Sequence, residues 1–100
     1  MATVSKVLAR TAAATTSATL YTTPAGSSAV VTNIAITNTT TGSVTATISL
    51  NSVALLSSVA VAANTTAFID LKQVLSATQT ITGQASTTAV NFHISGVELA

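Results

Sequence analysis

Apolar and polar residues alternate one by one along most of this chain. The alternation is cleanest over residues 43–50, where one parity is apolar and the other is Ser or Thr: Val44, Ala46, Ile48 and Leu50 against Ser43, Thr45, Thr47 and Ser49. Residues 90–95 repeat it, with Val90, Phe92 and Ile94 on one parity. A period of two places successive side chains on opposite faces of a β-strand. Both segments are therefore predicted to be strands with one buried face.

Two further segments show the same period less regularly. The positions predicted to face inward are Val30, Thr32, Ile34 and Ile36 in residues 29–38, and Val53, Leu55, Val59 and Val61 in residues 53–63. Residues 71–75 are irregular and are compatible with a single helical or 3₁₀ turn.

Near the C-terminus the phase of the alternation changes. Val97 and Leu99 fall on the parity opposite to Phe92 and Ile94, and Gly96 sits at the change. A glycine at a change of phase within a strand predicts a β-bulge there.

Turn residues separate the apolar runs. Thr23-Pro24-Ala25-Gly26 combines a fixed φ at Pro with a Gly that tolerates positive φ, residues 38–42 form a polar loop, and Asn51-Ser52 predicts a tight hairpin turn. The predicted strands lie near residues 3–10, 17–23, 28–38, 43–51, 53–62, 65–71, 79–84 and 89–99. This spacing predicts an all-β fold with residues 1–100 as one domain: a jelly-roll-like sandwich first, another Greek-key β-sandwich second.

The first residues carry the weakest pattern. Residues 2–17 are rich in Ala, Thr and Ser, which favours an extended arm or a strand over a helix. Lys6 and Arg10 within this possible N-terminal arm are the candidate contacts to a partner protein, because they can pair with carboxylates on its surface.

Composition indicates a chain whose surface is covered in an assembly. The chain has 21 Thr and 12 Ser but only five charged residues, and its mean hydropathy is +0.66. A soluble domain usually carries about a quarter charged residues, so we expect a homo-oligomer. Three scattered cations do not form the basic stripe that nucleic acid requires, and no apolar run reaches the roughly 18 residues of a membrane span. Neither nucleic acid nor membrane is expected as a partner.

Reactive chemistry is sparse in this sequence. His93 is the single histidine, and it is interpreted as a strand residue that hydrogen-bonds at a surface, with a base or a metal ligand as the alternative; copies of His93 could also meet on a symmetry axis. Asp70 and Glu98 are the two carboxylates, and no aromatic platform for a sugar accompanies them. The sequence contains no Gly-x-Ser-x-Gly elbow, no Gly-rich phosphate loop and no Cys. We expect no enzymatic activity, no catalytic residue, no metal and no cofactor.

Several short segments resemble a group of small structural proteins of tailed phages and prophages. They are Tyr21-Thr22-Thr23-Pro24-Ala25-Gly26, Val31-Thr32-Asn33-Ile34 with Asn38-Thr39, Leu50-Asn51, Ala62-Ala63-Asn64-Thr65, Leu71-Lys72-Gln73-Val74-Leu75 and His93-Ile94-Ser95-Gly96-Val97-Glu98. The resemblance spans roughly residues 20–99. It departs at Ala77-Thr78-Gln79, where such proteins often have a Gly-Asp turn.

The resemblance implies a component of a virion. The expected function is a capsid cement or decoration protein that stabilises the assembled head, with the major capsid protein or another virion protein as partner. A homotrimer is expected by analogy with jelly-roll virion proteins. The alternatives are a tail or fibre module, and a surface- or carbohydrate-binding adhesin domain.

Overall fold

The structure is a computed structural model that describes residues 3–99. Within those residues it contains eight β-strands and no helix: β1 (Thr3–Ala12), β2 (Ala18–Thr22), β3 (Ser28–Asn38), β4 (Val44–Leu50), β5 (Val53–Val61), β6 (Thr66–Leu75), β7 (Thr80–Ala85) and β8 (Val90–Leu99). The eight predicted strands are confirmed, with ends that differ by a few residues. The all-β prediction is confirmed with them.

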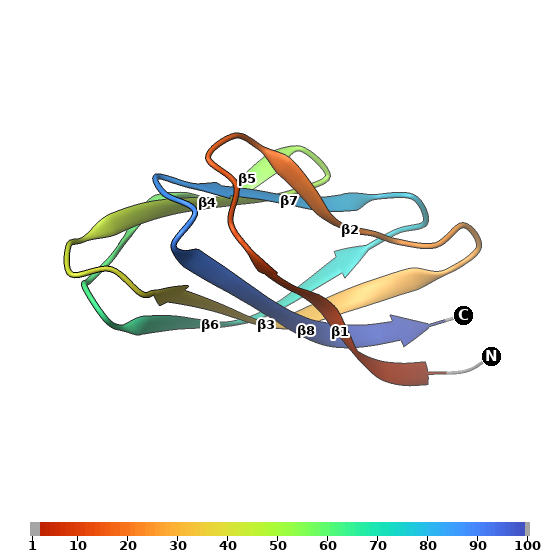
Figure 1. Ribbon diagram of the computed structural model, residues 1–100. Coiled ribbons are helices and arrows are strands. Elements are labelled where there is room, and N and C mark those ends of the chain that lie inside the picture. Colours follow the sequence, from red (N-terminus) through yellow and green to blue (C-terminus); the bar gives the residue numbers. More distant parts are fainter. Residues whose placement is uncertain (1–2, 100) are drawn as a thin grey trace.

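The strands form two antiparallel four-stranded sheets that lie one above the other (Figure 1). Sheet A has the order β1-β8-β3-β6, and sheet B has the order β2-β7-β4-β5. Each strand of the first half pairs with its counterpart counted from the other end, as β1 with β8, β2 with β7, β3 with β6 and β4 with β5. The chain is thus one long hairpin rolled into a sandwich, which is the jelly-roll arrangement.

The core lies between the sheets and is built mainly from aliphatic side chains, together with the rings of Phe92 and Tyr21. The largest fully buried apolar side chains are Phe92, Ile34, Ile36, Ile48, Leu75, Ile81, Ile94, Val31, Val61 and Val90. Gly83 of β7 leaves room for this packing, because a Cβ there would lie 3.2 Å from the ring of Phe92. Burial of these side chains is the main stabilising contribution to the fold.

Two strands change phase where the sequence predicted continuous alternation. The register of β3 shifts between Val31 and Asn33, so Val31 is fully buried, whereas the predicted Val30 lies on the other face. In β5 the register shifts twice, around Ser58, which has a φ of 49°, and at Leu55. Val53 pairs with Leu50 at the start of the strand and is 68% exposed. The predicted inward positions Val30 and Thr32 are wrong, because the bulge at Thr32 puts the residues before it out of phase with Ile34 and Ile36. The prediction for Val53 is wrong because this residue is exposed at the hairpin end of β5.

The bulge predicted at Gly96 lies on the neighbouring strands instead. The pairing of β8 runs through Gly96 without a skipped residue, while Leu8 of β1 and Thr32 of β3 are the residues passed over. Gly96 is required for a different reason: a Cβ at this position would lie 2.2 Å from the backbone oxygen of Val30.

Two segments predicted to be irregular belong to the sheets. β6 continues to Leu75, which pairs with Ala29 and is buried, so the helical or 3₁₀ turn predicted at residues 71–75 is wrong. β1 pairs with β8 from Thr3 to Ala12, so this part of the possible N-terminal arm is an edge strand of the sandwich. Ala2 lies outside the described residues.

The predicted turns are confirmed where local chemistry fixes them. Asn51 and Ser52 both have positive φ, at 51° and 64°, which is the two-residue type I′ hairpin between β4 and β5. The Pro24 turn closes through a hydrogen bond from the backbone N–H of Ser27 to the oxygen of Pro24, and Gly26 has a φ of 82°.

Thr23 offers a stabilising substitution. It is 1% exposed, and its hydroxyl is the buried side-chain group without a hydrogen-bond partner among residues 3–99. Because a buried, unpaired hydroxyl is costly, Thr23→Val is expected to raise the free energy of unfolding by about 1 kcal/mol. Urea denaturation measures this change. The exposed neighbour Thr22→Val is the control and should change stability little; a loss of stability at Thr23 would contradict the prediction.

Candidate interaction surface

All charged side chains of this protein lie on strands of sheet A. Lys6 and Arg10 are on β1, Asp70 and Lys72 on β6, and Glu98 on β8. His93 is also on β8, whereas the four strands of sheet B carry no charged residue. Electrostatic recognition by this chain is therefore confined to one layer.

Lys6, Glu98 and Tyr21 form a polar cluster that links the two sheets. The Nζ of Lys6 lies 3.1 Å from Oε2 of Glu98, and the hydroxyl of Tyr21 on β2 donates a hydrogen bond of 2.5 Å to the same oxygen. Burial, with the neighbouring carboxylate, raises the pKa of Tyr21 far above its ordinary value. The hydrogen bonds from Tyr21 and Lys6 lower the pKa of Glu98. This cluster fastens β8 to β2.

The cluster predicts a pH dependence of stability. Because the pKa of Glu98 is lower in the folded protein, its contribution is present above the unfolded-state pKa and is lost as the pH falls through the folded value. Wild type should therefore exceed Glu98→Gln in urea midpoint at neutral pH, and the difference should shrink in acid. A difference that is constant between neutral pH and strong acid would refute the role of the carboxylate.

The two predicted contact residues lie on opposite faces of β1. Lys6 pairs with the buried Gly96 and is engaged by Glu98. Arg10 is exposed and pairs with His93, and its Nε donates a hydrogen bond of 3.2 Å to Nδ1 of His93. Of the two, Arg10 is the one on the outer face of sheet A. Within residues 3–99 no three His, Cys, Asp or Glu side chains gather as a metal site would require.

The outer face of sheet A also carries large apolar side chains in contact with solvent. Phe68 is 73% exposed, Val74 67% and Val7 46%. An open hollow of about 430 Å³ is lined by Thr32, Asp70, Leu71 and Lys72. Of the three aromatic side chains, Tyr21 and Phe92 are buried and Phe68 is exposed.

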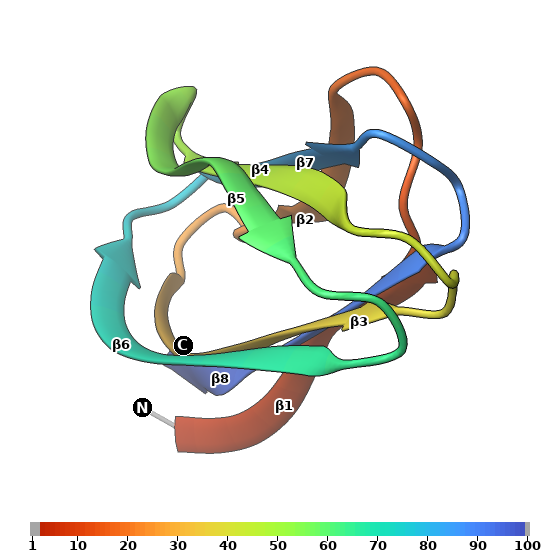
Figure 2. The same ribbon diagram turned by 90° about the vertical axis from the view of Figure 1, so that its left-hand side faces the viewer.

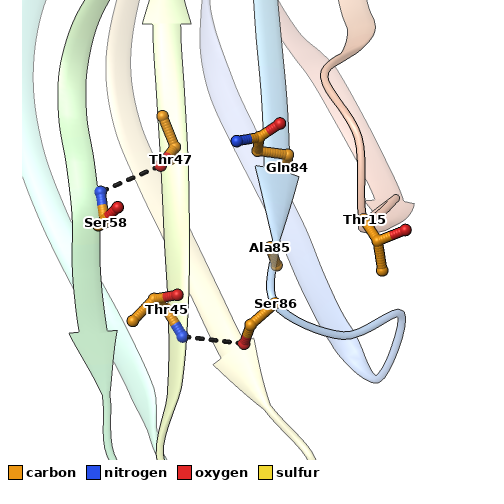
Figure 3. A pocket seen from close by; sticks show the side chains of 7 residues that line it. All are labelled: Thr15, Thr45, Thr47, Ser58, Gln84, Ala85 and Ser86. Atoms are coloured by element: carbon orange, nitrogen blue, oxygen red, sulfur yellow. Dashed lines mark hydrogen bonds between the residues drawn. The ribbon is translucent and has the colours of Figure 1, made fainter.

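Sheet B presents a different outer face, made of hydroxyls and small groups. It contains a hollow of about 180 Å³. Figure 3 shows the residues that line this hollow, which are Thr15, Thr45, Thr47, Ser58, Gln84, Ala85 and Ser86. Two hydrogen bonds tie these groups to the backbone, from the N–H of Ser58 to the hydroxyl of Thr47 and from the N–H of Thr45 to the hydroxyl of Ser86. The hollow has no charged or aromatic side chain. It offers no nucleophile with an adjacent base, and no stacking platform for a sugar.

Sequence reasoning found the cations of the surface but missed Phe68 and Val74. A signal was present: both residues share a parity with Asp70 and Lys72, and charged side chains mark the outer face of a half-buried strand. The irregular interpretation of residues 71–75 concealed this regularity.

Comparison with models of protein families, with curated proteins and with solved structures finds no match to this chain. The part of the chain that the structure describes has no helix long and apolar enough to cross a membrane.

Proposed function

We propose that this protein is a structural component of a virion, and that it acts as a capsid cement which stabilises the assembled head by binding. The observation that carries the proposal is the division of the surface: all charged groups and four of the five large exposed apolar side chains lie on sheet A, whereas sheet B has Val53 alone of these and presents mainly hydroxyls. A surface that combines exposed apolar side chains with charges is typical of protein–protein contact sites.

The small number of charges also suits docking. Each ionised group that is buried on association must be desolvated, which is unfavourable unless a partner compensates it. This chain carries five such groups, and two of them, Lys6 and Glu98, already pair with each other. A large contact can thus form at a small electrostatic cost.

The proposal is tested by mixing the purified protein with virus particles that lack it, followed by imaging and heating. We expect ordered density at symmetry-related positions of the head lattice and a higher rupture temperature. Density on the tail alone would support the tail or fibre alternative and reject the cement. Full occupancy without any gain in thermal stability would also reject it.

Matched variants distinguish the two faces. Phe68→Ser with Val74→Ser removes exposed apolar groups of sheet A, and Thr45→Ala with Thr47→Ala changes the hydroxyl face of sheet B. We expect the first pair to weaken particle binding at least about tenfold, the loss of roughly 1.4 kcal/mol, and the second pair to leave it nearly unchanged. Deletion of residues 2–17 is unsuitable as a test, because it would remove β1 from the sandwich.

A further inference from the structure

β6 is an edge strand whose outward side chains form a self-complementary series. It pairs with β3 on one side, with a register shift that leaves Leu71 and Lys72 without a partner on β3, and on its other side no strand lies among the described residues. Its outward positions read Phe68, Asp70, Lys72 and Val74, all of them exposed. The series is apolar, negative, positive, apolar. When two copies run antiparallel, each apolar residue therefore faces an apolar residue and each charge faces the opposite charge.

A second copy of β6 in antiparallel orientation matches this series when the two-fold axis passes through Leu71. Residue numbers then add to 142 across the pair, so Phe68 lies opposite Val74 and Asp70 opposite Lys72. Directly opposed residues of antiparallel strands lie on the same face with Cβ atoms about 5 Å apart. Both apolar groups gain a partner, and each of the two carboxylates meets an ammonium group.

The other edge strands match less well. β2 has only five residues, and β5 is interrupted around Ser58, where φ is positive. β1 carries two cations and no anion, so antiparallel pairing with itself would give no opposite charges. Figure 2 shows that β6 lies at the rim of its layer and curves toward sheet B near its C-terminal end. The hollow at Thr32, Asp70, Leu71 and Lys72 includes Leu71, through which the axis would pass.

We propose that β6 pairs with β6 of a second copy about a two-fold axis at Leu71 and joins the two A sheets into one continuous eight-stranded sheet. This inference names the self-contact of the proposed structural protein and rests on that function for its role. An isologous contact of this kind closes at two copies. It therefore replaces the expected homotrimer, which would require a heterologous contact between different edges.

Charge variants test the register directly. Position 70 of each copy faces position 72 of the other copy, so the dimer has two such charge pairs. Asp70→Lys turns both pairs into two positive charges, and Lys72→Asp turns both into two negative charges. Each single variant is expected to raise the dimer dissociation constant at least about tenfold. The double variant Asp70→Lys/Lys72→Asp restores opposite charges and should restore dimerisation. Mixing the two single variants should give a heterodimer, because each then supplies the charge that the other lacks.

Sedimentation equilibrium from micromolar to sub-millimolar concentration measures these constants against the 9.9 kDa monomer. Val74→Ser should weaken the dimer, and Val53→Ser, which changes an equally exposed valine of sheet B, should not. Circular dichroism confirms that each variant remains folded. A monomeric wild type, a trimer, or single charge variants that dimerise as wild type does would each overturn the inference.

The particle assay separates this inference from the proposed function. A wild-type protein that binds and stabilises particles as a monomer would retain the cement and reject the β6 pairing. A wild-type dimer with the expected charge rescue that leaves particles unbound would retain the pairing and reject the cement.

Discussion

Replacing Asn38 by aspartate is expected to destabilise the fold by about 3 kcal/mol at pH 7. Asn38 is 1% exposed, and its amide nitrogen donates to the backbone oxygens of Gly42, Val61 and Ala62 at 2.8, 3.0 and 3.2 Å. Its Oδ1 accepts hydrogen bonds from the backbone N–H and the hydroxyl of Thr40. This one side chain therefore holds the β3–β4 loop against the end of β5.

The effect of this substitution should depend on pH. An ionised aspartate would direct a carboxylate oxygen at three carbonyl oxygens, so burial and repulsion raise its pKa in the folded state above the unfolded value of about 3.9. With the folded pKa raised, the destabilisation is smallest below the unfolded pKa, grows as the pH rises, and levels off above the folded pKa. In its protonated form the carboxyl donates one hydrogen bond and restores part of the contact.

Two further variants complete this test. Asn38→Leu removes every hydrogen bond without adding a charge, so it should be destabilising to the same extent at all pH values. Asn64→Asp makes the same chemical change at an exposed residue and should alter stability by less than about 0.5 kcal/mol. Urea denaturation over a pH series measures all three. A penalty at Asn38→Asp that does not change with pH would show that the new carboxyl is solvated and that the site opens.

The positions of the strands could be predicted from the sequence, but their phases could not in every case. Any half-buried strand shows apolar and polar residues in alternation. For this reason the pattern predicts both the strands at residues 43–50 and 90–95 and their buried faces correctly. The bulges at Thr32 and around Ser58 carry no residue signature, because Thr and Ser also occur throughout regular strands here. Gly96 did carry a signature, but its cause was the close approach of the β3 backbone.

The arrangement of the surface depends on pairing between distant segments, and the local pattern does not contain it. Lys6 and Glu98 are 92 positions apart and meet because β1 pairs with β8. The gathering of all charges on sheet A likewise follows from the strand order. The outward series on β6 is the exception, since its parity and charges are visible in the sequence once the strand is known to continue to Leu75.

Replacing Gly96 by alanine should be more damaging than the same change at any other glycine of the sandwich core. The added Cβ would lie 2.2 Å from the backbone oxygen of Val30, and a backbone atom in the middle of a paired strand has no free rotation by which to move aside. The β3 strand must shift, and we expect destabilisation of about 3 kcal/mol or more.

Two other glycines supply a graded comparison under one substitution. At Gly83 the new Cβ would meet the ends of the Leu20 and Ile48 side chains at 2.8 and 2.9 Å, and these can rotate away, so Gly83→Ala should cost about 1 to 2 kcal/mol. At Gly42 nothing lies within 4 Å, and Gly42→Ala should be neutral or stabilising by up to about 0.5 kcal/mol.

Urea denaturation of the three variants tests this order. All three changes add one methyl group, so they differ little in the free energy of transferring that group from water. The order of their stabilities therefore depends mainly on the space around each Cβ. A Gly96→Ala protein as stable as Gly42→Ala would mean that the backbone of β3 does not approach β8 closely at Gly96. In that case the bulges at Leu8 and Thr32, which lie on either side of Gly96, would have to arise from their own strands and not from the close contact between β3 and β8.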